Sequence, residues 1–267
     1  MIKNTDSNLY IKNSTDDYLV WNPQKDARAL NIELSENTNS KIVYIMDSVC
    51  DTNLQIHLKK NSSLDLIILG TSKENLDLSK TIDTIIEENA YLNSKKLYCF
   101  NSNVNLVSKT FLQGKKASND DYQVILGCTK QLQKYMFEVT HNEKETFSTL
   151  QNYAICKNDS KINIDTNGII INGSKESNLN QKTKGILLSK DSEISANPWL
   201  QIDEYDCLAS HGAGIGAIDE EDLFYLMSRG LSRIESEKLL ISGFVNPVLE
   251  ALADKEKEIA LNLIQLL

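Results

Sequence analysis

The sequence predicts a mainly β fold in which many short strands stack as a solenoid and a small helical segment follows. Short runs of β-type composition recur between polar turns from about residue 41 to residue 202, and helical periodicity begins only after Gly216. We therefore expect an N-terminal segment at 1–40 that leads into the solenoid, a solenoid at 41–216 and a helical domain at 217–267.

The predicted strands alternate apolar and polar residues, as strands with one buried face do; residues 54–58 are an example. With only 11 Gly and 3 Pro in the chain, Asn and Asp must supply most turn residues, and Asn side chains can bond along a ladder. Hairpin signals such as Asn-Gly are scarce, which favours a solenoid of roughly four to eight coils over a sandwich or barrel. The strands are expected at residues 42–46, 54–58, 64–69, 82–86, 97–100, 104–107, 122–126, 135–139, 162–164 and 169–171.

The last quarter predicts three helices after a glycine-rich turn at residues 206–216. Asp219 suits the N-cap of the first helix, and Gly230 stands where a left-handed C-terminal stop is expected. Ser232 and Glu235 form a capping box for the second helix, which we expect Pro247 to interrupt. The apolar stripe of the third helix, at about 254–267, consists of Ile259, Leu263, Leu266 and Leu267. Such a tail can cap the open end of a solenoid and can also bind a partner.

The composition excludes several classes of partner. The net charge is -9 and the acidic residues are spread along the chain, so the basic surface of a nucleic-acid-binding or anionic-membrane-binding protein is missing. The first eight residues lack the apolar core of a secretory signal, and no segment approaches the ~20 apolar residues of a membrane-spanning helix. We therefore expect a cytosolic protein.

The cysteines and two of the histidines are expected to be structural. The five cysteines are odd in number and never form Cys-x-x-Cys, which argues against a disulfide framework or a thiolate metal site. Small buried side chains are expected at Cys50, Cys99, Cys128 and Cys156. His57 and His141 have no nearby ligands in sequence, so we expect surface or structural roles for them.

Ordered motifs from about residue 140 to residue 248 resemble the SufB/SufD family of iron–sulfur cluster assembly proteins. The motifs are Gln181 with residues 185–189, Asn197-Pro198-Trp199-Leu200-Gln201-Ile202, Asp206, Ser210-His211-Gly212-Ala213, residues 216–219, residues 223–226 and Ser228-Arg229-Gly230. The resemblance implies a right-handed parallel β-helix followed by a helical domain. It also implies pairing of two such subunits through their C-terminal strands, with each helical domain docked on the ABC-type ATPase SufC.

The motifs are more similar to SufD than to SufB. Residues 181–186 lack the cysteine of SufB-like members, and the histidine motif is His211-Gly212-Ala213. Three features depart from the family pattern: Ala209 replaces a common cysteine, Gly214 replaces a common threonine, and the chain is short. These departures leave open a divergent paralogue that pairs with itself or with a SufB-like protein.

The resemblance implies a noncatalytic scaffold in which an iron–sulfur cluster or iron is held transiently between subunits. The chain has no phosphate-binding loop of the Gly-x-x-x-x-Gly-Lys type, so ATP hydrolysis would belong to the SufC-like partner. His211 is the candidate ligand, because imidazole binds iron, and Cys207 lies four residues before it. A histidine that only stabilises the turn is the structural alternative, and simple burial is the alternative for Cys207.

The candidates for the ATPase contact lie in the helical domain, because aromatic residues and arginine are typical interface anchors. They are Leu223, Phe224, Tyr225, Arg229 and Phe244, with Glu220, Glu221 and Asp222 as a polar rim. Packing between the helices is the alternative role for Leu223 and Phe224.

Two other functions are compatible with a β-solenoid. A polysaccharide-active β-helix enzyme needs close carboxylates or a bound cation on the solenoid wall, and its candidates are Asp47, Asp51, Asp65, Asp77 and Asp83. A purely structural scaffold would bind the ATPase without requiring His211.

Overall fold

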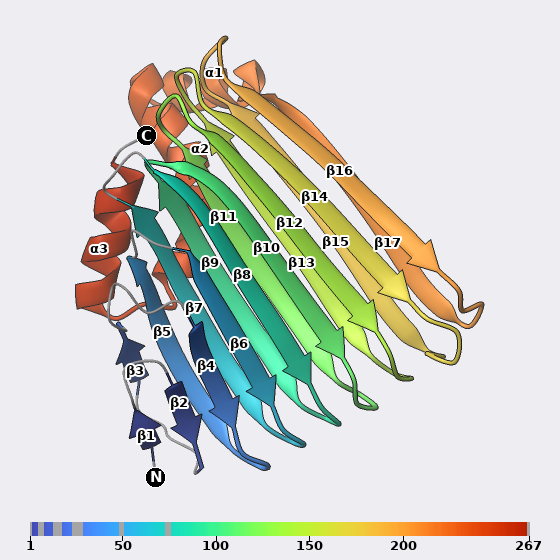
Figure 1. The fold of residues 1–267 in the computed structure, drawn as a ribbon. Coiled ribbons are helices and arrows are strands. Elements are labelled where there is room, and N and C mark those ends of the chain that lie inside the picture. The colour runs from blue at the N-terminus through green and yellow to red at the C-terminus, as the bar shows by residue number, and fades with distance from the viewer. Residues whose placement is uncertain are drawn as a thin grey trace.

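The computed structural model describes residues 2–4, 8–12, 18–22, 29–47, 51–72 and 76–265, which form two facing sheets and three helices (Figure 1). The first sheet contains β1 (Ile2–Asn4), β2 (Asn8–Ile11), β4 (Ala29–Leu34), β6 (Thr52–Leu58), β8 (Asp77–Ile86), β10 (Asn103–Leu112), β12 (Leu132–His141), β14 (Lys161–Ile170) and β16 (Glu193–Ile202). The second contains β3 (Tyr18–Trp21), β5 (Asn39–Asp47), β7 (Ser63–Ser72), β9 (Tyr91–Phe100), β11 (Ser118–Gly127), β13 (Phe147–Cys156), β15 (Ser177–Leu187) and β17 (Cys207–Ala217).

From β2 onward, successive strands alternate between the two sheets, which confirms the solenoid prediction. Each described strand from β4 onward pairs in parallel with the strand one coil earlier, as β10 does with β8, whereas β1 and β2 pair antiparallel. Val104 pairs with Gln133, and Gln133 pairs with Ile162, an offset of 29 residues per coil. The sheets already include β2, β3 and β4, so the stacked strands begin before residue 41.

The space between the sheets is filled by one side of every strand. Most of these side chains are apolar, and the aromatic ones stack across coils, as Tyr98 does on Tyr135 with ring centroids 5.7 Å apart. One ion pair is also buried here: Lys96 Nζ lies 2.7 Å from a carboxylate oxygen of Asp121, and both side chains are 5% exposed. Ser94 donates a further hydrogen bond to Asp121, so the carboxylate is satisfied inside the core.

Asparagine supplies the left-handed residue in several turns, as predicted. Asn37, Asn61 and Asn89 have φ values of 56°, 57° and 52° at equivalent places in successive coils. The Asn61 side chain donates to Asn37, and the Asn89 side chain donates to Asn61, at 2.9 and 3.2 Å. The ladder joins neighbouring turns at the same corner of the solenoid.

The three helices are α1 (Glu220–Ser228), α2 (Arg233–Leu249) and α3 (Asp254–Ile264). The predicted caps are confirmed: Asp219 accepts from the backbone of Glu221, Ser232 and Glu235 form the capping box, and Gly230 has a φ of 97°. Helices α2 and α3 pack on the outer face of the second sheet through a second apolar cluster. None of the described helices is long and apolar enough to cross a membrane.

The prediction that Pro247 interrupts the second helix is wrong, because α2 continues through it to Leu249. A proline inside a helix removes one backbone hydrogen bond. Val245, Val248 and Leu249, on both sides of it, are buried against the second sheet, and this packing holds the last turn of the helix. In the third helix, Leu263 is buried as expected, while Leu266 and Leu267 lie outside the described residues.

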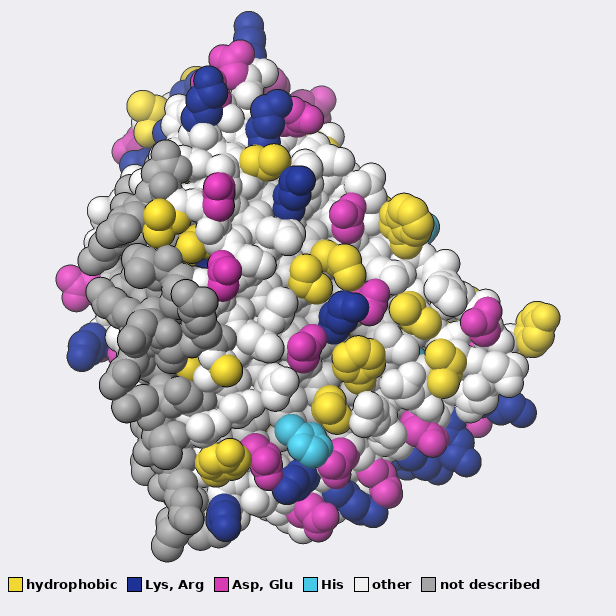
Figure 2. All heavy atoms as spheres, viewed as in Figure 1, with side chains coloured by type: hydrophobic (Ala, Val, Ile, Leu, Met, Phe, Trp, Pro, Cys, Tyr) yellow, Lys and Arg dark blue, Asp and Glu magenta, His cyan; other side chains and the backbone are white. Residues whose placement is uncertain are grey.

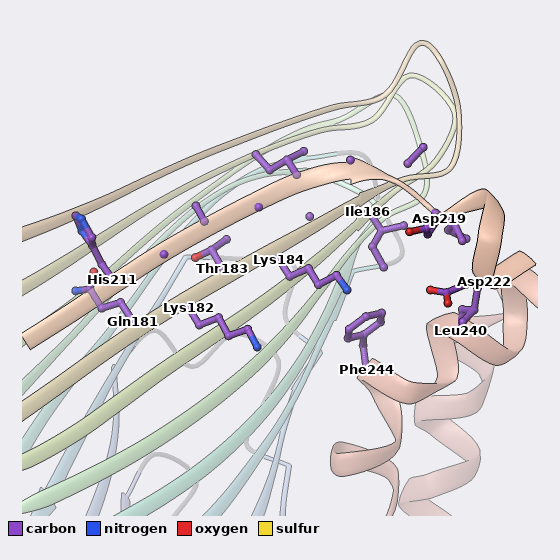
Figure 3. A pocket seen from close by; sticks show the side chains of 18 of the residues that line it. Gln181, Lys182, Thr183, Lys184, Ile186, His211, Asp219, Asp222, Leu240 and Phe244 are labelled. Atoms are coloured by element: carbon purple, nitrogen blue, oxygen red, sulfur yellow. The ribbon is translucent and has the colours of Figure 1, made fainter.

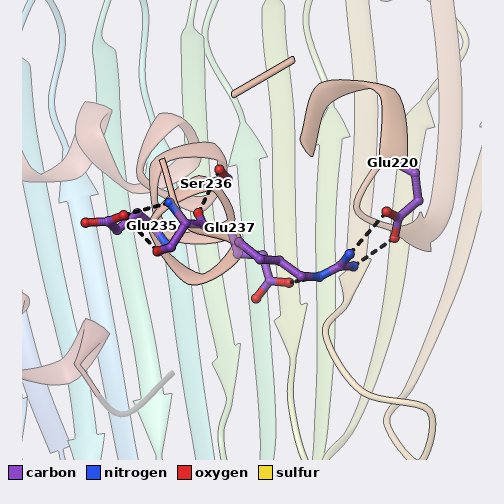
Figure 4. Close-up of polar contacts among 6 residues, drawn as sticks. Glu220, Glu235, Ser236 and Glu237 are labelled. Carbon is purple, nitrogen blue, oxygen red and sulfur yellow. Dashed lines mark hydrogen bonds and ion pairs between the residues drawn. The ribbon is translucent and has the colours of Figure 1, made fainter. Parts of the chain in front are cut away.

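Arg233 ties the first two helices together at the surface. Its guanidinium donates two hydrogen bonds to the Glu220 carboxylate and one to Glu237 (Figure 4). This fork holds the pKa of Glu220 below its usual range. The start of α1 is thus fixed relative to α2 by a bidentate contact.

Candidate functional site

The segment predicted as a glycine-rich turn is a strand, and this prediction is corrected here. Residues 207–217 form β17, which pairs along its whole length with β15. Glycines 212, 214 and 216 occupy every second position, and none of them has a positive φ. The period of two indicates a strand, whereas glycine composition alone favours a turn.

The register of β17 places His211 on the interior face of the last coil. His211 pairs with Gln181 of β15, which is 2% exposed and points between the sheets. Figure 3 shows His211 and Thr183 on one side of these strands, whereas Lys182 and Lys184 extend on the other side, where Phe244 lies. A hollow of about 780 Å³ follows both faces of β17.

The imidazole of His211 is exposed and makes no hydrogen bond or ion pair with any residue that the structure describes. The Gln181 amide beside it is buried, and neither its nitrogen nor its oxygen has a hydrogen-bond partner. From the sequence, Gln181 is predicted only as a family landmark. Its inward orientation depends on the pairing of β15, which residue spacing alone does not give.

The last coil leaves two unpaired strand edges. Among the described strands, β16 and β17 end their sheets and have a hydrogen-bonded neighbour on one side only. No residue of β17 is Asp, Glu, Lys or Arg, the charged types that commonly protect an exposed edge. Large apolar side chains are also exposed on the last coil (Figure 2), among them Trp199 on β16, Tyr205 in the turn that follows it and Leu208 at the start of β17.

Cys207 lies on the same face of β17 as His211 but far from it. Four residues along a strand span ~13 Å, much longer than any metal–ligand bond. The thiol is half-buried and donates to the Glu204 backbone oxygen at 3.2 Å, and partial burial together with the nearby acids raises its pKa. Cys207 and His211 of one chain therefore do not share an ion.

His211 has no companion donors for a metal among the described residues. In the parts of the chain that the structure describes, no three His, Cys, Asp or Glu side chains are placed to hold a metal ion. An iron bound at His211 would need ligands from another molecule.

The residues considered for ATPase docking separate by exposure. Phe224 and Tyr225 are 75% and 57% exposed, and Arg229 lies over the Tyr225 ring at 5.4 Å. Leu223, on the same helix, is buried. Phe244 is half-buried, with its ring 5.1 Å from that of Tyr153, so it holds α2 on the second sheet.

The acids around α1 also differ in what they contact. Glu220 is bound by Arg233, whereas Asp222 lines the hollow beside β17. Glu221 is exposed, and its backbone nitrogen donates to the N-cap, Asp219.

Three of the five acids of the alternative polysaccharide site accept hydrogen bonds within the solenoid. Asp51 accepts from the Ser79 backbone, Asp65 from the Asn93 side chain and Asp77 from the Asn103 side chain. Asp83 lines a hollow on the outer face of the first sheet. The side chain of Asp47 lies outside the described residues.

The other histidines and cysteines take the structural places expected of them. His57 Nε2 lies 2.7 Å from a carboxylate oxygen of Glu87, and His141 is fully buried. Cys99, Cys128 and Cys156 are buried free thiols, and Cys50 lies outside the described residues.

Comparison with known proteins agrees with this architecture. The family model described as "SUF system FeS cluster assembly, SufBD core domain" matches residues 24–244. The iron–sulfur cluster assembly protein SufD of Bacillus subtilis (strain 168) is 32% identical over 143 residues, which are 54% of this chain and 33% of the relative. SufD of Escherichia coli (strain K12) is 34% identical over 94 residues, 35% of this chain and 21% of the relative.

A SufBD family protein of Pyrococcus horikoshii is 40% identical over 87 residues, 32% of this chain and 19% of that protein. In each of these comparisons, the match spans a third or less of the relative's length.

Proposed function

Because this chain belongs to the SufB/SufD family of iron–sulfur cluster assembly proteins and is SufD-like, we propose that it is a noncatalytic scaffold subunit of a cytosolic assembly complex. In this proposal, it pairs with a second β-helix subunit at its last coil and docks on a SufC-like ABC ATPase through its helices. The cluster is cargo held between subunits, and ATP is hydrolysed by the partner.

The unprotected edge of β17 is the observation that carries the pairing proposal. An uncharged edge of eleven residues offers backbone donors and acceptors to another strand. The exposed Leu208 of β17 and Trp199 of β16 supply apolar surface on the same coil, of the kind that aromatic-rich interfaces bury. A SufB-like paralogue or a second copy of this chain fits this edge.

His211 is proposed as the ligand that this chain contributes to the cargo. The ring is exposed at the last coil, and its nitrogens are not engaged by any described residue. A pairing subunit would bring further donors, such as a thiolate, to the same place. An incomplete ligand set in each subunit suits a cluster that has to be released.

The test replaces His211 with Ala and measures cluster yield after reconstitution with the ATPase and a SufB-like partner. We expect iron and sulfide bound per complex to fall several-fold while the subunit ratio stays unchanged. His57→Ala, which removes a histidine far from the last coil, is the matched control. Unchanged cluster yield in the His211 variant would contradict the ligand role of His211 and favour a purely structural scaffold.

The ATPase contact is proposed at the exposed face of α1, formed by Phe224, Tyr225 and Arg229. Aromatic side chains beside an arginine are frequent energetic centres of interfaces. We expect Phe224→Ala and Arg229→Glu each to weaken co-purification with the ATPase by at least tenfold, with unchanged circular dichroism. Leu261→Ala, on the exposed side of α3, should have no effect.

The docking result is independent of the cluster result. Retained ATPase binding in both α1 variants would overturn the docking face and leave the role of His211 standing. Loss of binding in the Leu261 variant as well would instead indicate that the helices as a whole are being perturbed.

A further inference from the structure

Two buried thiols lie together under the helical tail, far from the last coil. Cys99, near the end of β9, and Cys128, directly after β11, have their Sγ atoms 3.9 Å apart. The two strands are neighbours in the second sheet. Cys99 also faces α3, with its Sγ 3.7 Å from the backbone oxygen of Leu263.

The surroundings favour a reactive role for one member of this pair. The Sγ atoms of Cys99 and Cys128 share a hydrogen bond, and this contact, with the nearby Lys157 ammonium, lowers the pKa of Cys128. The same hydrogen bond and burial raise the pKa of Cys99. Cys128 therefore ionises first, and the Asn158 side chain holds its backbone oxygen at 2.8 Å.

We propose that Cys99 and Cys128 are a redox modification site that closes to a disulfide by exchange with a small disulfide such as glutathione disulfide. The sulfur atoms have to approach from 3.9 Å to the ~2.05 Å of a disulfide bond, which side-chain rotation on adjacent strands can supply. Cys99 is held by its ladder pairing with Thr71, and the Asn158 side chain holds the backbone oxygen of Cys128, so the second thiol is present at high effective concentration.

The exchange balances in two steps. The Cys128 thiolate attacks one sulfur of glutathione disulfide, forming a mixed disulfide and releasing one glutathione thiolate. Cys99 then loses its proton to water and attacks the Cys128 sulfur, releasing the second glutathione. The protein dithiol is oxidised to a disulfide, and one glutathione disulfide is reduced to two glutathione thiols.

Helix α3 limits access to the site. Cys99 and Cys128 are 3% and 8% exposed, and Leu263 packs in the same cluster. An oxidant reaches the thiols only when the end of α3 moves away from the sheet. The rate of oxidation therefore depends on how often the end of α3 separates from the second sheet. Which two cysteines become cross-linked does not depend on that separation.

The experiment equilibrates the folded full chain in glutathione redox buffers, quenches with acid, alkylates the free thiols and maps the cross-link by mass spectrometry. We expect one disulfide, between Cys99 and Cys128, that is absent from Cys99→Ala and Cys128→Ala. Cys156→Ala removes a buried cysteine on the interior side of the sheet and should leave the cross-link intact. The same cross-link should form at much lower yield in urea.

The proposed disulfide would be contradicted if the folded chain keeps both thiols under oxidising glutathione. It would also be contradicted if other cysteines cross-link equally well. A second measurement tests whether α3 limits access to the thiols. Leu263→Ala should speed oxidation severalfold, and Leu261→Ala, on the exposed side of the same helix, should not. Equal rates in both variants would contradict the proposed access through α3.

Discussion

His141 occupies a place in the solenoid where a charged ring cannot be accommodated. It is fully buried, and its two ring nitrogens lie 2.7 Å from the hydroxyls of Thr146 and Ser148. Burial lowers its pKa to about 4. The sequence indicated a structural histidine from the absence of ligand spacing, but the two hydroxyl partners depend on how the turn after β12 folds back.

The buried His141 makes stability depend on pH. An unfolded histidine titrates near 6.5, so between about pH 6.5 and 4 the unfolded chain binds a proton that the folded chain does not. The contribution of neutral His141 is complete above about pH 6.5 and is lost as the pH falls toward 4, by up to about 3 kcal/mol. Urea unfolding at pH 7 and pH 4.5 measures the loss.

His141→Gln is the comparison, because an amide in this place does not titrate. We expect the variant to lose less stability than the parent chain over the same pH range. An identical loss in both proteins would mean that other groups cause the acid sensitivity.

At the scale of elements, local signals predicted helix ends better than strand ends. Asp219 and Ser232 were assigned correctly because a cap depends on residues within one turn. Pro247 was misassigned because long-range packing of α2 on the sheet outweighs a local preference. The β17 segment was misassigned because its ladder partner, β15, lies thirty residues earlier in the chain.

A charge on β17 should block pairing without harming the fold. A Cβ atom added at Gly214 would meet no atom within 4 Å, and the residue lies within the strand. Gly214→Lys should therefore fold normally and weaken association with a second β-helix subunit at least tenfold, because the lysine would have to be desolvated at the interface. Analytical ultracentrifugation measures the association.

Leu132→Lys is the control, since it places the same charge on β12, which has neighbours on both sides. This variant should associate as the parent chain does. If Gly214→Lys associates normally, β17 is not the pairing edge.

At the scale of the whole molecule, the solenoid form was predictable, but its pairing surface was not. Alternating residues, asparagine turns and the missing hairpin signals define stacked coils from sequence. Which face of His211 is accessible depends on the register between β15 and β17. Residue spacing carries no information on that register.

Occupation of the last coil should stabilise the whole chain. A subunit that binds only the folded form, present at 100 times its Kd, adds about 2.7 kcal/mol to the free energy of unfolding. We expect this increase when a SufB-like β-helix protein is added, or with rising concentration of this chain alone if it pairs with itself. Gly214→Lys should abolish the increase, and equal stability under all conditions would argue against any pairing.

The three glycines of β17 have a consequence for how a partner is chosen. With no side chains at residues 212, 214 and 216, the outer side of the strand presents bare peptide planes. Such a surface accepts any extended segment of suitable twist, whatever its residues. Discrimination between a second copy of this chain and a paralogue would then depend on the bulky exposed side chains of the same coil, Trp199 and Tyr205. Exchanging those two side chains would change which subunit binds without altering β17 itself.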